Sequence, residues 1–203
     1  MKLKHCLLAL GLLNLVACAS MYGGDNSSQT ASNDQNNSNN KPLWYVGPAT
    51  IGSGDQTLEN SKYSALTVGG DLTATQITVI NDLQIESDAS LTQVTVRDDS
   101  NIKGNLNATK CTFKDLTTVG GNISSIDTYF GNGITFSGGS LMLSSRSKVI
   151  GNIISNSAKP ATIIIDKSTV KGNIQFAAAG GKVILQNKGK LTGQVSNGQI
   201  VNE

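Results

Sequence analysis

Three consecutive 17-residue blocks repeat one pattern of apolar and polar residues, and this repetition constrains the fold of the chain most. The blocks cover residues 70–86, 87–103 and 104–120. Stacked without gaps, they align Ile77 with Val94 and Cys111, Val79 with Val96 and Phe113, and Leu72 with Ala89 and Leu106. Apolar residues at alternate positions indicate short strands with one face turned inward. The chain offers no long segment of helical period, so we predict an all-β fold, a single-stranded parallel β-helix or β-solenoid, over residues 64–203.

Longer units of the same kind follow the first three. The blocks 151–171 and 172–192 are each 21 residues long, and Gly151-Asn152-Ile153 matches Gly172-Asn173-Ile174. Between the two sets lies a 30-residue unit that begins at Gly121, in which we expect residues 128–133 to form a loop that bulges from one coil. Coils of about 17–21 residues and seven unit starts predict a rod of about 30 Å.

The recurring signature of these units is an apolar residue, any residue, Gly, a residue such as Asn, Asp or Gln, and a second apolar residue. Glycine supplies corner conformations that residues with a Cβ resist. Asn beside it can form hydrogen-bonded ladders between coils, as stacked amides do in cross-β structures.

The first residues have the pattern of an export signal. Lys2 and Lys4 precede a short apolar run, which is too short for a transmembrane helix and fits a cleavable signal peptide over residues 1–17. The run ends in Leu15-Val16-Ala17-Cys18. This motif resembles the lipobox of bacterial prolipoproteins, although an ordinary secretory signal that contains a cysteine is the alternative.

The resemblance to prolipoproteins implies cleavage between Ala17 and Cys18, an S-diacylglyceryl group on Cys18 and an acylated new amino terminus. The acyl chains would anchor the protein in the lipid bilayer, since several chains bind far more firmly than one. Ala19 occupies the position where Asp would favour the inner membrane, so the resemblance favours the outer membrane. Whether the protein faces the periplasm or the cell surface stays open.

Two segments separate the anchor from the repeats. Residues 18–42 are rich in Asn, Ser, Gly and Gln and have no periodic apolar pattern, so we expect a disordered tether that spans roughly 25–30 Å. Residues 43–63 contain Trp44 and Tyr45, which we expect to cap the open end of the core, because terminal coils need covering. A surface aromatic site is the alternative for this pair.

Removal of the signal changes what chemistry is available. The full chain has 16 basic and 14 acidic residues, and loss of Lys2 and Lys4 leaves 14 of each, so we expect no nucleic-acid partner. The single histidine, His5, is lost as well, which excludes Ser–His–Asp and Cys–His catalysis and histidine-containing metal sites. Cys111 remains the one free thiol, so we expect no internal disulfide, no cofactor and no resident metal.

Four groups of side chains are candidate sites. Asp98-Asp99 could supply a carboxylate pair for glycoside hydrolysis, but Asp-Asp-Ser-Asn is also ordinary turn sequence. Asp82, Glu86 and Asp88 could offer oxygen ligands to calcium, but their spacing fits no calcium loop. We expect Cys111 to be a buried small hydrophobe. The last group is a pair of threonine columns that would form a flat hydroxyl face, as in ice-binding solenoids: Thr75, Thr92 and Thr109 beside Thr78, Thr95 and Thr112.

Residues 64–200 resemble the β-helix of bactofilin-type polymer-forming proteins in their apolar–x–Gly–x–apolar rhythm, and more generally the β-helices of passenger and pectin-degrading proteins. We therefore expect a non-enzymatic, membrane-anchored lipoprotein that acts as a structural or interaction module of the bacterial envelope, with an envelope protein or a glycan as partner. The alternatives are a polysaccharide-active or carbohydrate-binding β-helix and a self-polymerising scaffold.

Overall fold

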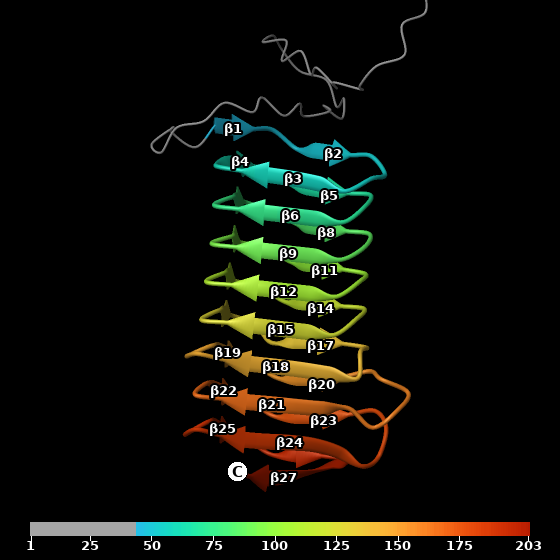
Figure 1. The fold of residues 1–203 in the computed structure, drawn as a ribbon, viewed down its shortest axis with the longest axis vertical. Helices are drawn as coiled ribbons and strands as arrows, with labels where there is room; N and C mark the ends of the chain where they lie inside the picture. The colour runs from blue at the N-terminus through green and yellow to red at the C-terminus, as the bar shows by residue number, and fades with distance from the viewer. Residues whose placement is uncertain (1–43) are drawn as a thin grey trace, which may run out of the picture.

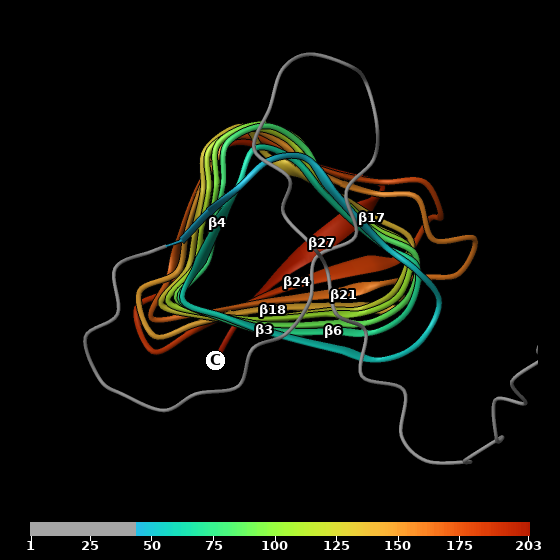
Figure 2. The ribbon, with the colours of Figure 1, turned by 90° about the horizontal axis from the view of Figure 1, so that it is seen from above.

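The computed structural model describes residues 44–203, and side chains from residue 47 on. The predicted signal peptide, Cys18 and the predicted tether lie outside the described residues. The chain forms a parallel β-solenoid of about nine turns whose coils stack as a straight rod (Figure 1). Seen along the rod, each coil is a triangle with one short strand on each side (Figure 2).

The three sides are three parallel sheets of nine strands, named here after their first strands. The β1 sheet contains β1 (Trp44–Val46), β4 (Ser61–Tyr63), β7 (Thr78–Val79), β10 (Thr95–Val96), β13 (Thr112–Phe113), β16 (Tyr129–Phe130), β19 (Lys148–Ile150), β22 (Thr169–Lys171) and β25 (Lys190–Thr192). The β2 sheet contains β2 (Ala49–Ile51), β5 (Leu66–Val68), β8 (Leu83–Ile85), β11 (Ser100–Ile102), β14 (Thr117–Val119), β17 (Ile134–Phe136), β20 (Ile153–Ser155), β23 (Ile174–Phe176) and β26 (Val195–Ser196). The β3 sheet contains β3 (Gln56–Glu59), β6 (Leu72–Thr75), β9 (Ala89–Thr92), β12 (Leu106–Thr109), β15 (Ile123–Ile126), β18 (Ser140–Ser144), β21 (Thr162–Asp166), β24 (Gly181–Gln186) and β27 (Gly198–Asn202).

Three corners connect the sheets. Corner 1 leads from the β1 sheet to the β2 sheet, corner 2 from the β2 sheet to the β3 sheet, and corner 3 from the β3 sheet to the β1 sheet of the next coil. Corner 3 is built on residues with left-handed backbone, and Gln76, Gln93 and Lys110 all have φ between 54° and 56°. Single residues adopt this conformation at a modest cost, so this corner carries no glycine signal in the sequence.

The inward columns confirm the predicted register of the 17-residue blocks. Leu72 pairs with Ala89 and Ala89 with Leu106, while Val79 pairs with Val96 and Val96 with Phe113. All of these side chains are buried. The Phe113 and Phe130 rings stack with centroids 5.2 Å apart, so the same pattern of apolar burial continues into the next coil.

The 30-residue unit was interpreted wrongly. Tyr129–Phe130 is not a bulging loop: it is strand β16, which pairs with β13 and β19. The unit looked long because the Gly-Asn-apolar signature changes corner. Gly121-Asn122 lies at corner 2, whereas Gly151-Asn152 lies at corner 1. The extra residues lie instead at corner 2 of the later coils, in 156–161 and 177–180, which protrude in Figure 2.

Two further details differ from the expected repeat. Ile163 pairs with Val183, so this step of the β3 sheet is 20 residues rather than 21. At the other end, β1, β2 and β3 pair with β4, β5 and β6, so part of the segment expected as a cap forms a full coil in register. Each sheet has nine strands rather than the expected seven, which gives a rod of about 38 Å at the usual strand spacing.

Candidate functional site

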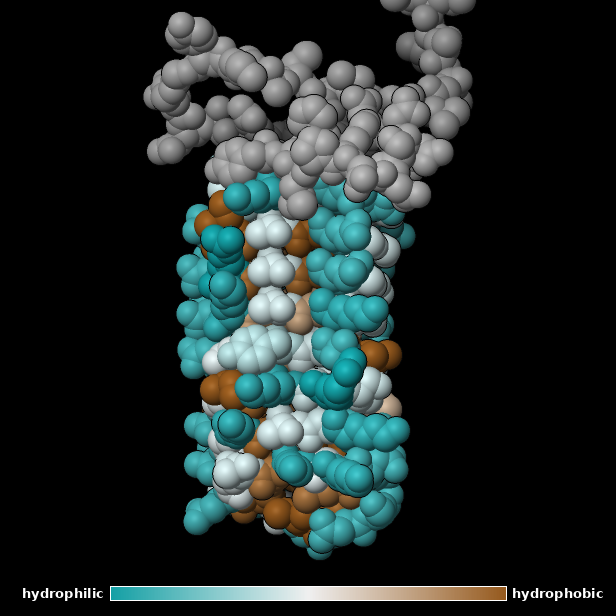
Figure 3. Space-filling view, turned by 90° about the vertical axis from the view of Figure 1, so that its left-hand side faces the viewer, coloured by the Kyte–Doolittle hydropathy of each residue, from teal (hydrophilic) through white to brown (hydrophobic). Residues whose placement is uncertain are grey.

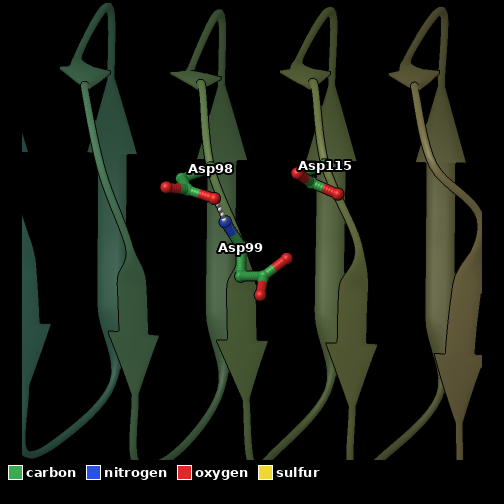
Figure 4. A group of neighbouring side chains, drawn as sticks. All are labelled: Asp98, Asp99 and Asp115. Atoms are coloured by element: carbon green, nitrogen blue, oxygen red, sulfur yellow. Dashed lines mark hydrogen bonds between the residues drawn. The ribbon is translucent and has the colours of Figure 1, made fainter.

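The acidic pair Asp98-Asp99 lies at corner 1, between β10 and β11, and Asp115 follows on the next coil (Figure 4). One carboxylate oxygen from each residue lies within 4.8 Å of the others. The first two side chains are exposed and Asp115 is half-buried. Among the described residues this is the group that could hold a metal ion, and it comes from two coils rather than from one local motif.

The carboxylates of this group also make ordinary turn contacts. Asp98 Oδ1 accepts a hydrogen bond from the Asp99 amide at 3.1 Å, and Asp115 Oδ1 accepts one from the Leu116 amide at 2.9 Å. Asn132 Nδ2 donates to Asp115 Oδ1 at 2.6 Å from the next coil. These contacts agree with the expectation that the aspartates serve as turn residues.

The electrostatics of the group are unfavourable in the absence of a cation. Desolvation raises the pKa of Asp99 above its usual range, and the carboxylates of Asp115, Asp98 and Asp82 raise it further. The buried hydroxyls of Ser100 and Thr117 have no hydrogen-bond partner, but both side chains face the interior of the solenoid. They therefore offer nothing to the carboxylates outside.

The three carboxylates weighed as calcium ligands do not form a site. Asp82 lies at corner 1, and Glu86 and Asp88 lie at corner 2, at the opposite end of β8. Glu86 forms an ion pair with Lys103, and this hydrogen bond is the main reason why its pKa is lowered. These three carboxylates are therefore separate corner residues and do not converge on one ion.

Cys111 is buried and faces inward, as expected. Its thiol donates to the carbonyl oxygens of Leu91 at 3.3 Å and Thr109 at 3.4 Å. Desolvation raises its pKa to about 11, so the thiolate needed for nucleophilic chemistry is scarce at neutral pH.

The threonine columns do not form the expected flat hydroxyl face. Thr75, Thr92 and Thr109 end strands of the β3 sheet, whereas Thr78, Thr95 and Thr112 lie in the β1 sheet. Corner 3 separates the two columns, because its left-handed residues turn the chain between them. Each threonine column therefore stays on its own sheet: one on the β3 sheet and the other on the β1 sheet.

The predicted ladders of corner residues are present, and each step has a side-chain oxygen that accepts from a backbone amide of the next coil. At corner 2, Asp88 Oδ1 accepts from the Asn105 amide at 2.7 Å, and Asn105 Oδ1 accepts from the Asn122 amide at 2.8 Å. At corner 1, Asn152 Oδ1 accepts from the Asn173 amide at 2.9 Å. The ladder changes corner together with the sequence signature, so these residues are explained by the architecture.

The feature that sequence reasoning missed is the distribution of charge along the rod. Residues 47–137 carry five basic and ten acidic residues, a net charge of −5, whereas residues 138–203 carry eight basic and two acidic residues, a net charge of +6. The near-neutral total conceals this asymmetry. Counting charge separately in the two halves of the repeat array would have revealed it.

Six of the basic residues lie together on the last three coils. We call this group the basic face: Arg146, Lys148, Lys167, Lys171, Lys188 and Lys190. All six side chains are exposed. Arg146, Lys167 and Lys188 lie at successive turns of corner 3, and Lys148, Lys171 and Lys190 lie in the adjoining β1 sheet.

A shallow depression of about 320 Å³ lies beside the last corner 2 and contains no titratable side chain, being lined by Ala179, Gly180, Asn197, Gly198 and Gln199. No helix long and apolar enough to cross a membrane occurs among residues 44–203. Trp44 and Tyr45 lie in β1, where the backbone alone is described. Compared with known proteins, the chain matches no family model, no curated protein and no solved structure at a significant level.

Proposed function

We propose that the chain is a lipid-anchored lipoprotein of the bacterial envelope, with the outer membrane favoured, whose β-solenoid is a non-enzymatic structural or interaction module. The anchor is supported by Leu15-Val16-Ala17-Cys18 at the end of a signal-like apolar run.

One observation supports the proposed non-enzymatic role of the solenoid: side chains fill its interior. The inward side chains form a continuous apolar core in which the polar members are small Ser and Thr residues, and the deepest positions are occupied by large side chains such as Phe113, Phe136 and Phe176. Such a rod offers its outer faces, rather than an internal cavity, to partners.

Two cysteines of the amino-terminal segment provide a matched test of the anchor. Metabolic labelling with a palmitate analogue should mark the wild-type chain and the Cys6→Ser variant, but not the Cys18→Ser variant. Membrane fractionation should release only the Cys18→Ser protein. Labelling that persists in Cys18→Ser would refute the lipid anchor, since cysteine is the residue that receives the diacylglyceryl group.

A second candidate function, hydrolysis of a polysaccharide, is favoured by the grouping of Asp98, Asp99 and Asp115 on one corner. Glycosidases use two carboxylates, one of which has a raised pKa and acts as the acid. Incubation of the purified chain with a panel of glycans tests this. Cleavage that is lost in Asp99→Asn, but kept in the distant Asp55→Asn, would establish the enzyme and displace the non-enzymatic proposal.

A further inference from the structure

The basic face repeats one arrangement on three successive coils. Arg146 precedes Lys148 by two residues, Lys188 precedes Lys190 by two, and Lys167 precedes Thr169 in the same way. Lys148 pairs with Thr169, and Thr169 with Lys190, so these positions form one outward column of the β1 sheet. Neighbouring coils are about 4.8 Å apart, so the three corner 3 cations form one row along the rod. In the second row, on the β1 sheet, Thr169 separates Lys148 from Lys190.

The same positions are mostly uncharged on the preceding coils. Corner 3 carries Gln76, Gln93, Lys110 and Asp127 there, and the β1 sheet carries Thr78, Thr95, Thr112 and Tyr129. Figure 3 shows a row of side chains of intermediate hydropathy, drawn white, over the upper coils. Lower down, more hydrophilic side chains interrupt this row. The uninterrupted run of corner 3 cations thus begins at Arg146, because Asp127 lies between it and Lys110.

Little within residues 47–203 compensates these cations. Arg146 has an ion pair with Asp127 at 3.5 Å, but its side chain is 83% exposed. Asp166 accepts a hydrogen bond from Asn187 Nδ2 at 2.7 Å, and Lys148 Nζ lies 5.8 Å from the Tyr129 ring. Like charges on neighbouring strands repel each other, so an anion that lies along both rows would relieve this repulsion.

We propose that the basic face binds a linear anionic polysaccharide, a polyuronate in chemical type, laid along the rod axis. The proposal rests on the proposed function, because it names the partner class of the interaction module. The coil spacing is comparable to the length of one sugar unit in an extended chain, so successive carboxylates can meet successive coils. The net charge of −5 on residues 47–137 confines such a chain to the last coils.

Two other polyanions fit the face less well. Single-stranded nucleic acid is generally held by aromatic platforms and arginine, whereas this face has five lysines, one arginine and one neighbouring aromatic ring, Tyr129. A flat anionic bilayer laid along the whole β1 sheet would also meet the carboxylates of Asp98, Asp99 and Asp115 at corner 1. A single linear chain avoids both difficulties.

The test measures binding of a fluorescent oligogalacturonate to the full-length chain in non-ionic detergent by fluorescence anisotropy, with neutral dextran as the uncharged control. One variant removes four charges of the basic face: Lys148→Gln, Lys167→Gln, Lys188→Gln and Lys190→Gln. The control variant removes four exposed basic residues elsewhere: Arg97→Gln, Lys114→Gln, Lys159→Gln and Lys182→Gln. Both variants change the net charge equally.

We expect saturable binding to oligogalacturonate that weakens with salt, and none to dextran. The basic-face variant should lose affinity by roughly ten- to hundredfold, because four exposed ion pairs are removed, and the control variant should lose little. Equal losses in the two variants, or no binding by the wild type, would overturn the proposal. So would binding of single-stranded DNA or of phosphatidylglycerol vesicles that is as tight as that of the oligogalacturonate. Palmitate labelling of the same preparation reports on the anchor separately.

Discussion

The hydrogen-bond ladder at corner 2 predicts that the side-chain amide of Asn105 links three successive coils. Asn105 Oδ1 accepts from the Asn122 amide at 2.8 Å, and its Nδ2 donates to the two carboxylate oxygens of Asp88 at 3.1 and 3.3 Å. Asn105→Ala removes both interactions but keeps the bond from its own amide to Asp88 at 2.7 Å.

The expected loss follows from these contacts. A neutral hydrogen bond contributes about 0.5–1.5 kcal/mol net. The half-exposed bond to the Asp88 carboxylate is screened by water and adds about 0.2–1 kcal/mol. We therefore expect Asn105→Ala to lower the free energy of unfolding by about 1–2 kcal/mol, which corresponds to a fall in Tm of roughly 2–8 °C for a chain of this size.

Asn107 provides the matched control, because it lies in the same coil, faces outward and is exposed. Urea unfolding followed by far-ultraviolet circular dichroism should give Asn105→Ala a clearly lower free energy of unfolding than Asn107→Ala. Hydrogen exchange adds a local measurement, since the Asn122 amide should lose protection by roughly tenfold for each 1.4 kcal/mol. The reasoning is refuted if the two variants unfold alike or if the Asn122 amide keeps its protection.

Three further predictions concern a glycine, the thiol and the acidic group. A Cβ on Gly120 would lie 2.0 Å from the Lys103 carbonyl oxygen, so Gly120→Ala should destabilise the fold by about 1–3 kcal/mol, whereas Gly139→Ala, with open space around its Cβ, should be neutral or mildly stabilising in the same thermal melts. Cys111, with its pKa of about 11, should react with a thiol reagent at pH 8 only when the protein is unfolded by denaturant, and rapid labelling of the native protein would contradict the burial described. The pKa of Asp99 is raised in the folded state, so its carboxylate opposes folding once the pH exceeds the usual aspartate range. Because the Asp99 side chain is exposed, solvent screens these interactions, so Asp99→Asn should stabilise the protein at pH 7 by only a few tenths of a kcal/mol. The gain should vanish near pH 3, where the wild-type carboxyl is protonated as well.

The sequence alone was sufficient for the fold and for the register of its most regular part. Inward positions such as Leu72 and Val79 recur every 17 residues, and a shift of one residue would expose them, so the pattern admits one alignment. The change of corner between Asn122 and Asn152 was not predictable in this way. The Gly-Asn signature reports that a corner forms a ladder, but all corners of a triangular coil can use the same hydrogen bond.

The outer faces were predicted less well. Gln76 and Gln93 carry no glycine signal for the left-handed corner, and for this reason two threonine columns seemed to share one face. The basic face was hidden by a total charge near zero, and its members are far apart in the sequence, as Arg146 and Lys190 show. Only the stacking of coils places them in rows.

The equal coils between Leu72 and Ile123 have a consequence for how such a chain can change its length. At corner 2 of each coil one residue donates its amide to the coil before and accepts with its side-chain oxygen from the coil after. One 17-residue block can therefore be removed or duplicated while the strand register and the ladder are kept. The length of the rod is thus quantised in steps of about 4.8 Å. With the proposed lipid anchor, the distance of the distal end of the rod from the membrane could be adjusted by whole coils without a change at either terminus.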